Sequence, residues 1–167
     1  MIALKISNKK EFMAKLLTTE VFDKFLVEEA TVETFNTFHI DGKIHRDFYK
    51  NDPDYTDEKT FSKFSSWSEI RPICLNLIKG KRTPLGFKFV LHLDEEAKEK
   101  LVESADAGIV PSQVTMGLTI KFYNDEILVT SGISIGIFTL DKSIEKAWDS
   151  YLPSFLESNG IETKDYA

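Results

Sequence analysis

The chain has 167 residues, of which 42% are hydrophobic and 29% are charged, with 13 Phe and 2 Trp. This composition is typical of a globular protein with a proper hydrophobic core and excludes a disordered chain. The net charge of −6 and the pI of about 5.2 argue against non-specific binding to nucleic acid or to an anionic membrane, but are compatible with a local basic patch.

Cysteine content and terminal sequence indicate the compartment. Cys74 is the only cysteine, so the chain has no intramolecular disulfide, as is usual in a reducing environment. The opening sequence MIALKISNKKEF lacks the long apolar segment of a signal peptide, and no run of residues is long enough to span a membrane. We therefore expect a soluble cytoplasmic protein that does not contact membranes.

The first 50 residues predict a strand, a helix and a hairpin. Residues 1–6 form a short strand, and Asn8 with Glu11 is a capping pair for the helix that follows. Residues 27–49 predict two strands around Asp41-Gly42, the strongest short hairpin pattern in the chain. The core side chains expected from the helix are Phe12, Met13, Leu16 and Leu17.

Residues 51–84 predict an exposed polar connection and then a helix from Ser66 or Ser68 to Lys79. Pro72 is compatible with this helix only in its first turn, where a backbone N–H is not needed. Lys79-Gly80 marks the helix end. The apolar stripe of the helix comprises Ile70, Ile73, Cys74, Leu77 and Ile78.

Residues 85–140 repeat the order of the first 50. A strand over 87–93 precedes Asp94, which caps a helix to about Ser104, and a hairpin over 114–137 turns at Asn124-Asp125. A last helix begins near Asp141, is bent at Pro153 and ends at Asn159-Gly160. Its expected core side chains are Ile144, Trp148, Tyr151, Leu152, Phe155 and Leu156.

The 114–137 hairpin predicts two different sheet faces. One parity is apolar, from Val114 to Ile137. The other parity pairs Thr115 with Ser134, Gly117 with Gly132, and Thr119 with Thr130, a nearly uncharged strip of small side chains. Since glycines weaken a strand unless something uses the space, either a helix of this chain or a second molecule should pack there. We favour the second molecule, in a two-fold homodimer.

Three motifs are interpreted without a functional role. Residues 132–136, GISIG, match the G-x-S-x-G nucleophile elbow, but they lie in a β-rich run and all three histidines precede them. In the predicted register His39 lies opposite Ile44 and His45 opposite Phe38, on opposite faces, so the pair should not share a metal ion. The acidic side chains that resemble part of a calcium loop are interpreted as a solvated linker, because the loop's glycine and terminal glutamate are missing: Asp52, Asp54, Asp57 and Glu58. We predict no catalytic residue, no metal site and no cofactor.

One basic cluster stands out in the acidic chain and comprises Lys79, Lys81, Arg82 and Lys88. Cations at a helix C-terminus are favoured by the helix dipole, which explains part of the cluster without a ligand. An exposed basic loop can also hold phosphate or a nucleic-acid backbone. Cys74, within an apolar stripe, is expected to be a buried thiol rather than a nucleophile.

Three stretches carry a resemblance to a known family: WSEIRPICLNLIKGKRTPLGFKF at 67–89, the opening MIALKISNKKEF, and IFTLDKSIEKAWDSYL at 137–152. Through them the chain resembles an uncharacterised bacterial family, domain of unknown function 5721, over nearly its whole length. The resemblance implies no activity.

We predict an α+β fold in a single domain over 1–167. Two strand–helix–hairpin (βαββ) units, 1–50 and 85–140, are joined by the linker and central helix of 51–84, with mostly antiparallel sheet and a C-terminal helix, 141–160, packed on it. The duplicated order is similar to half of a sliding DNA clamp, an analogy of fold that implies no function. The leading hypothesis is a non-enzymatic cytoplasmic binding or scaffold module that self-associates. A nucleic-acid-associated protein is the alternative, and an enzyme built from residues distant in sequence is the third.

Overall fold

The computed structural model describes residues 1–53 and 62–166, and within them seven strands form one sheet. The sheet order is β3-β2-β4-β5-β6-β1-β7, and every neighbouring pair is antiparallel. Both predicted units therefore contribute to one sheet, with β1 placed beside β6 and away from β2. The strands are β1 (Ala3–Ile6), β2 (Phe25–Glu33), β3 (Thr37–Asp41), β4 (Gly86–Leu93), β5 (Val114–Tyr123), β6 (Glu126–Ile135) and β7 (Thr163–Asp165).

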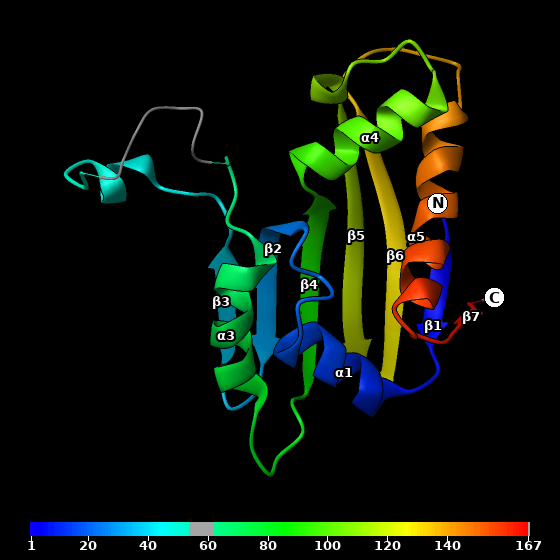
Figure 1. The fold of residues 1–167 in the computed structure, drawn as a ribbon. Coiled ribbons are helices and arrows are strands. Elements are labelled where there is room, and N and C mark those ends of the chain that lie inside the picture. The colour runs from blue at the N-terminus through cyan, green and yellow to red at the C-terminus, as the bar shows by residue number, and fades with distance from the viewer. Residues whose placement is uncertain (54–61, 167) are drawn as a thin grey trace.

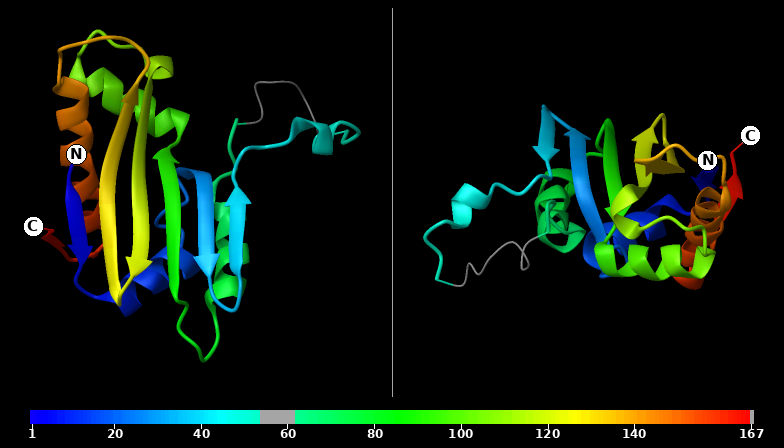
Figure 2. Two further views of the ribbon diagram at one scale, coloured as in Figure 1. Left: turned by 180° about the vertical axis from the view of Figure 1, so that it is seen from behind. Right: turned by 90° about the horizontal axis from the view of Figure 1, so that it is seen from above.

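The helices α1 (Lys9–Thr18), α3 (Trp67–Ile78), α4 (Glu95–Ala105) and α5 (Ser143–Ser158) lie on one face of this sheet (Figure 1). The view from above shows these helices on a single side of the strands (Figure 2). Two short 3-10 turns, η1 (Arg46–Tyr49) and η2 (Pro111–Gln113), lie in connections. The predicted α+β fold with its C-terminal helix on the sheet is confirmed.

Two helix starts follow from the capping residues predicted for them. Asn8 Oδ1 accepts a hydrogen bond from the Glu11 N–H at 3.1 Å, and Asp94 Oδ1 accepts one from the Ala97 N–H at 2.9 Å. Each bond satisfies a backbone donor that has no partner within the first helical turn.

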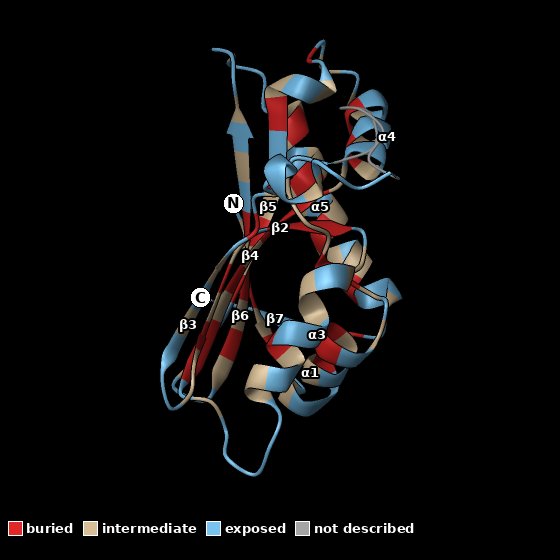
Figure 3. Cartoon of the chain, turned by 90° about the vertical axis from the view of Figure 1, so that its left-hand side faces the viewer, coloured by how far each residue is buried: buried red, intermediate tan, exposed pale blue. Residues whose placement is uncertain are grey.

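The hydrophobic core lies between the helices and the sheet (Figure 3). The apolar parity of β5, from Val114 to Phe122, is buried there. The helix α5 contributes Ile144, Trp148, Leu152 and Leu156 as buried side chains. Aromatic rings of α1, β2, α5 and the residues before β2 pack edge to face or tilted, with centroids 5.4–5.9 Å apart: Phe12, Phe22, Phe25 and Phe155.

The predicted hairpin at Asn124-Asp125 is confirmed. Both residues have positive φ, 51° and 63°, as a two-residue turn between right-twisted strands requires. The register that follows pairs Thr115 with Ser134, Gly117 with Gly132, and Thr119 with Thr130, as the sequence predicts.

The predicted hairpin at Asp41-Gly42 is wrong. The chain turns at residues 34–36 instead, and His39 pairs with Thr31 rather than with Ile44. Gly42 follows β3 and donates its N–H to the Glu28 carbonyl at 3.0 Å, beside a register shift between Val27 and Glu29. A Cβ at Gly42 would lie 1.8 Å from the Val27 oxygen, so this glycine permits a close backbone approach at a β-bulge and not a tight turn.

The helix α3 differs from its prediction in two details. It begins at Trp67, whose indole N–H donates to the Leu16 carbonyl at 2.8 Å and fixes the buried side of the helix. Ile73 is therefore displaced from that side and is 49% exposed. Pro72 lies beyond the first turn and is exposed, so the carbonyl that loses its helical partner lies on the solvent side of the helix.

Part of the acidic connection lies outside the described residues, including Asp54, Asp57 and Glu58 of the calcium-loop-like sequence. Across residues 1–53 and 62–166, each helix is too short or too polar to cross a membrane.

Candidate functional site

The sheet face opposite the helices, here called the open face, is covered by no helix of the described chain (Figure 2). It carries all six residues of the predicted interaction strip, on the central strand β5 and on β6: Thr115, Gly117, Thr119, Thr130, Gly132 and Ser134. An added Cβ at Gly132 would meet nothing within 4 Å. We considered that a helix of the same chain packs on this strip. Among the described residues that alternative is wrong, because the helices pack on the apolar side of the sheet. Binding of a second molecule there stays a prediction.

Charge on the open face is unevenly distributed: one side has an acidic excess that Lys88 of β4 partly offsets, and the other has a basic excess that Glu126 of β6 partly offsets. Glu29 and Glu33 of β2 and Asp41 of β3 form what we call the acidic flank. Lys5 of β1 and Lys164 of β7, which are directly paired across their strands, form the lysine flank. Like charges in direct cross-strand register oppose folding unless other charges offset them. Lys5 forms an ion pair with Glu126 at 2.6 Å.

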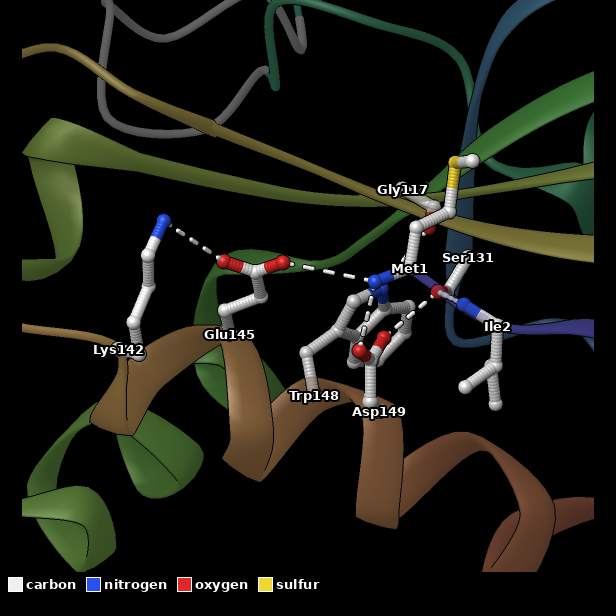
Figure 4. Close-up of polar contacts among 8 residues, drawn as sticks. All are labelled: Met1, Ile2, Gly117, Ser131, Lys142, Glu145, Trp148 and Asp149. Atoms are coloured by element: carbon white, nitrogen blue, oxygen red, sulfur yellow. Dashed lines mark hydrogen bonds and ion pairs between the residues drawn. The ribbon is translucent and has the colours of Figure 1, made fainter.

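The glycine strip is held from behind by the helix α5 (Figure 4). The Trp148 indole N–H donates to the Gly117 carbonyl at 2.9 Å. Ser131, buried on the core side of β6, donates its hydroxyl to Asp149 Oδ1 at 2.6 Å and accepts from the Ile2 N–H at 2.9 Å. These bonds connect β5, β6 and the residue before β1 to one helix, behind the glycine strip.

The same network includes exposed charges around the amine of Met1 (Figure 4). That amine lies 2.9 Å from Asp149 Oδ2 and 3.4 Å from Glu145 Oε1. Glu145 also lies 3.4 Å from the Lys142 ammonium. Because the Met1 amine and Lys142 are largely exposed, we assign little of the fold's stability to these ion pairs.

The structure brings together three of the four residues predicted to contact an anion. Lys79, Lys81 and Arg82 are exposed and line a groove of about 590 Å³ beside Phe35 and Leu85. Lys88 is absent from the lining of that groove. It lies on the open face, where its ammonium pairs with Glu29 at 3.2 Å.

Sequence reasoning missed a second cavity, at the end of the open face near the start of α4. It has a volume of about 560 Å³ and includes His92 and Lys98 in its lining. Burial lowers the pKa of His92, the Lys98 charge lowers it further, and Glu95 acts in the opposite direction. The alternation of β4 places His92 on the open face, but no sequence pattern indicates which segment covers it.

Comparison with known proteins identifies a family without assigning an activity. A family model described as a family of unknown function (DUF5721) matches residues 15–164. The chain belongs to this family. Neither a curated protein nor a solved structure matches it. The likeness to half of a sliding clamp therefore stays a prediction.

In this DUF5721 member, the serine of the G-x-S-x-G match, the two histidines and the cysteine lie at positions with a structural explanation. Ser134 of the G-x-S-x-G match lies within β6 rather than at a strand-to-helix turn. His39 Nδ1 lies 3.0 Å from the Thr31 hydroxyl, and His45 precedes η1. In the described part of the chain, no group of three or more His, Cys, Asp or Glu side chains could hold a metal ion. Cys74 is fully buried, and burial raises the pKa of its thiol to about 12.

Proposed function

We propose that this protein is a single-domain, non-enzymatic binding module of the cytoplasm that forms a two-fold homodimer through its open face. The observation that carries the proposal is the arrangement of that face, with an uncovered glycine strip at the centre and flanks of opposite charge. The cytoplasmic location is supported by the single, reduced and buried thiol of Cys74.

Symmetry determines which flanks would meet. The strand β5 is the middle one of the sheet order, with β2 and β3 on one side and β1 and β7 on the other. A two-fold axis in the interface plane and parallel to β5 exchanges these two sides. Each acidic flank would then face the partner's lysine flank, and the same pair of contacts would form twice.

The glycine pair supplies the close approach. Sheets packed face to face normally stand about 10 Å apart, with side chains filling the space, and cross at about 30°. Gly117 and Gly132 project no side chain, and their neighbours Thr119 and Thr130 are small, so two such strips can approach closely. Lys121 lies near the C-terminal end of β5, beyond Thr119. Its ammonium lies 5.0 Å from the ring centroid of Tyr123.

Sedimentation velocity of the wild type and of Gly132→Val tests this proposal. Valine suits a strand and has free space in the monomer, so the variant should keep its circular dichroism spectrum and sediment as a monomer where the wild type is dimeric. Ser150→Val, an exposed substitution on α5, should leave the dimer intact. A monomeric wild type at high concentration, or a dimeric Gly132→Val protein, would refute the proposal.

A second candidate function, nucleic-acid binding, is favoured by the composition of the groove at residues 79–85. Its three cations have no ion-pair partner among the described residues, and Phe35 beside them is 83% exposed. Exposed aromatic rings next to cations can stack on bases while the cations contact phosphates. The net charge of −6 opposes this function over the rest of the surface.

Fluorescence anisotropy with a labelled single-stranded oligonucleotide tests this second candidate. Binding should weaken steeply with salt, and the double substitution Lys81→Ala/Arg82→Ala should reduce both the affinity and the salt slope. Lys88→Ala is the matched control, since Lys88 pairs with Glu29 outside the groove. No binding at low salt would exclude this function.

A further inference from the structure

Polar side chains are buried without sufficient partners in the cavity at the end of the open face, which we call the His92 pocket. Residues 62–64, the end of β4, the start of α4 and the residues beside η2 surround it, and its volume is about 560 Å³. Small-molecule sites typically have volumes of about 300–1,000 Å³. The pocket is therefore large enough for a small metabolite.

His92 is buried because the side chain of Phe64 packs against it from a segment that lies beside β2. The Ser65 backbone accepts a hydrogen bond from the Val27 N–H and donates one to the Gly42 carbonyl, which fixes residues 64–66 beside β2. Phe64 then packs edge to face on the His92 ring, with centroids 4.8 Å apart, and His92 is only 8% exposed. Its Nδ1 atom is buried and has no hydrogen-bond partner among residues 1–53 and 62–166. Buried ring nitrogens are normally paired, so this atom needs an explanation.

Lys98 is a second buried polar side chain in the lining of the pocket. Its residue is 7% exposed, and its ammonium donates one hydrogen bond within the described structure, to Glu95 Oε1 at 3.1 Å. An ammonium has three donors, so a buried one with a single acceptor has capacity for another acceptor. Lys98 lines the pocket, and its partner Glu95 is 67% exposed.

We propose that the His92 pocket binds a small molecule through an oxyanion, a carboxylate or a phosphate group, that accepts hydrogen bonds from Lys98 and His92. Ser112 and Thr115 contribute further hydroxyls, and Leu26, Phe64 and Val114 offer apolar surface for the carbon part of the ligand. The other charged residues of the lining, Lys63, Glu28 and Glu95, balance to one negative charge, which Lys98 offsets. The remaining N–H groups of Lys98, together with His92 in the tautomer that carries its proton on Nδ1, favour an acceptor-rich group.

The three histidines of the chain provide the measurement, because His39 and His45 are exposed controls for His92. A bound oxyanion stabilises a protonated imidazole and so raises the pKa of His92, opposing the effects of burial and of Lys98. The pocket lining around this ring also includes Glu95, Glu28 and Lys63. The same three side chains are present with and without the added anion, so they do not explain a difference in the pKa of His92 between the two conditions.

The experiment is an NMR titration of the three imidazoles with inorganic phosphate and, separately, with succinate. We expect one of the two to shift the His92 signals saturably and to move their titration to higher pH, while the signals of His39 and His45 stay in place. Phosphate alone would indicate a phosphorylated ligand, and succinate alone a carboxylate. His92 signals that respond to neither probe would overturn the proposal.

Two variants establish the role of the pocket. Lys98→Met keeps the length of the side chain but removes its donors, and should weaken binding by about 10-fold to 100-fold, the range for a lost charged hydrogen bond. Lys100→Met, on the exposed side of the same helix, should have no effect. If Lys98→Met fails to fold, His92→Gln serves in its place, with binding followed by the backbone amide signals of the pocket because this variant lacks the reporter imidazole. Repeating the titration on Gly132→Val separates this proposal from dimerisation, and unchanged binding by both pocket variants would contradict it.

Discussion

Cys74 shows how burial alone changes the acidity of a side chain. The thiol lies on the buried side of α3 with no exposed surface, and its pKa rises from 9.0 to about 12 because the thiolate would lose its hydration. The unfolded chain therefore releases this proton at lower pH than the folded chain. The contribution to stability is complete below pH 9 and is lost as the pH rises through 12.

Urea unfolding at two pH values tests this linkage. Between about pH 8 and about pH 10, the wild type should lose about 1–1.5 kcal/mol more of its unfolding free energy than Cys74→Ala, which cannot ionise there. Tyrosines and lysines titrate in both proteins, so the difference between them isolates the thiol. An equal loss in both proteins would show that Cys74 is not buried in the folded state.

Single residues also show where sequence reasoning succeeds and where it fails. The caps Asn8 and Asp94 were predictable because a helix N-terminus is a local feature, set by residues within one turn. Gly42 was misinterpreted because its role depends on Val27, which is 15 positions earlier in the chain. His92 was missed for the same reason, since Phe64 covers it from a segment distant in sequence.

The helix α5 joins the N-terminal segment of the chain to the sheet. Ser131 on β6 and Asp149 on α5 form a short hydrogen bond, and the Ser131 hydroxyl also accepts from Ile2 of the N-terminal segment (Figure 4). Removing the hydroxyl leaves a partly buried backbone N–H and a carboxylate oxygen without these partners. Because water can reach both groups, the two losses together cost about 1–3 kcal/mol.

Ser131→Ala should therefore lower the unfolding free energy by about 1–3 kcal/mol, measured by urea or thermal unfolding. The matched control is Ser150→Ala on the exposed side of α5, where alanine should be neutral or slightly stabilising. A Ser131→Ala protein as stable as its control would show that α5 does not depend on this bond.

The order of helices and strands along the chain was predictable from the sequence. Which strands pair in the sheet was only partly predictable. The β5–β6 hairpin followed from Asn124-Asp125 and strict alternation, both of which are local. The placement of β1 beside β6, over 100 residues later in the chain, follows from no local pattern. The sequence therefore predicted the content of the open face at β5 and β6 but not the charged strands that flank it.

At the scale of the whole molecule, the fold is a two-layer arrangement with helices on one face and an uncovered sheet on the other (Figure 3). The strip that was predicted from alternation lies on the uncovered face, so the surface expected to bind is accessible. The acidic and lysine flanks lie on opposite sides of its central strand. Our central claim is that this arrangement makes the face complementary to itself.

A charge exchange between two variants tests that claim most directly. One variant carries Lys5→Glu and Lys164→Glu, and the other carries Glu29→Lys and Glu33→Lys. In each variant alone, both contacts of the two-fold dimer bring like charges together, so neither should dimerise. In the mixture, each flank of one variant meets an opposite charge on the other.

Sedimentation velocity of the two variants, separately and mixed at equal concentration, gives the result. Circular dichroism should first show that both are folded, because the exposed intramolecular pairs that they disrupt contribute little to stability. If the open face is self-complementary, the two variants are monomers that form a heterodimer when mixed. Two monomers that stay monomeric when mixed, or variants that still dimerise alone, would contradict it.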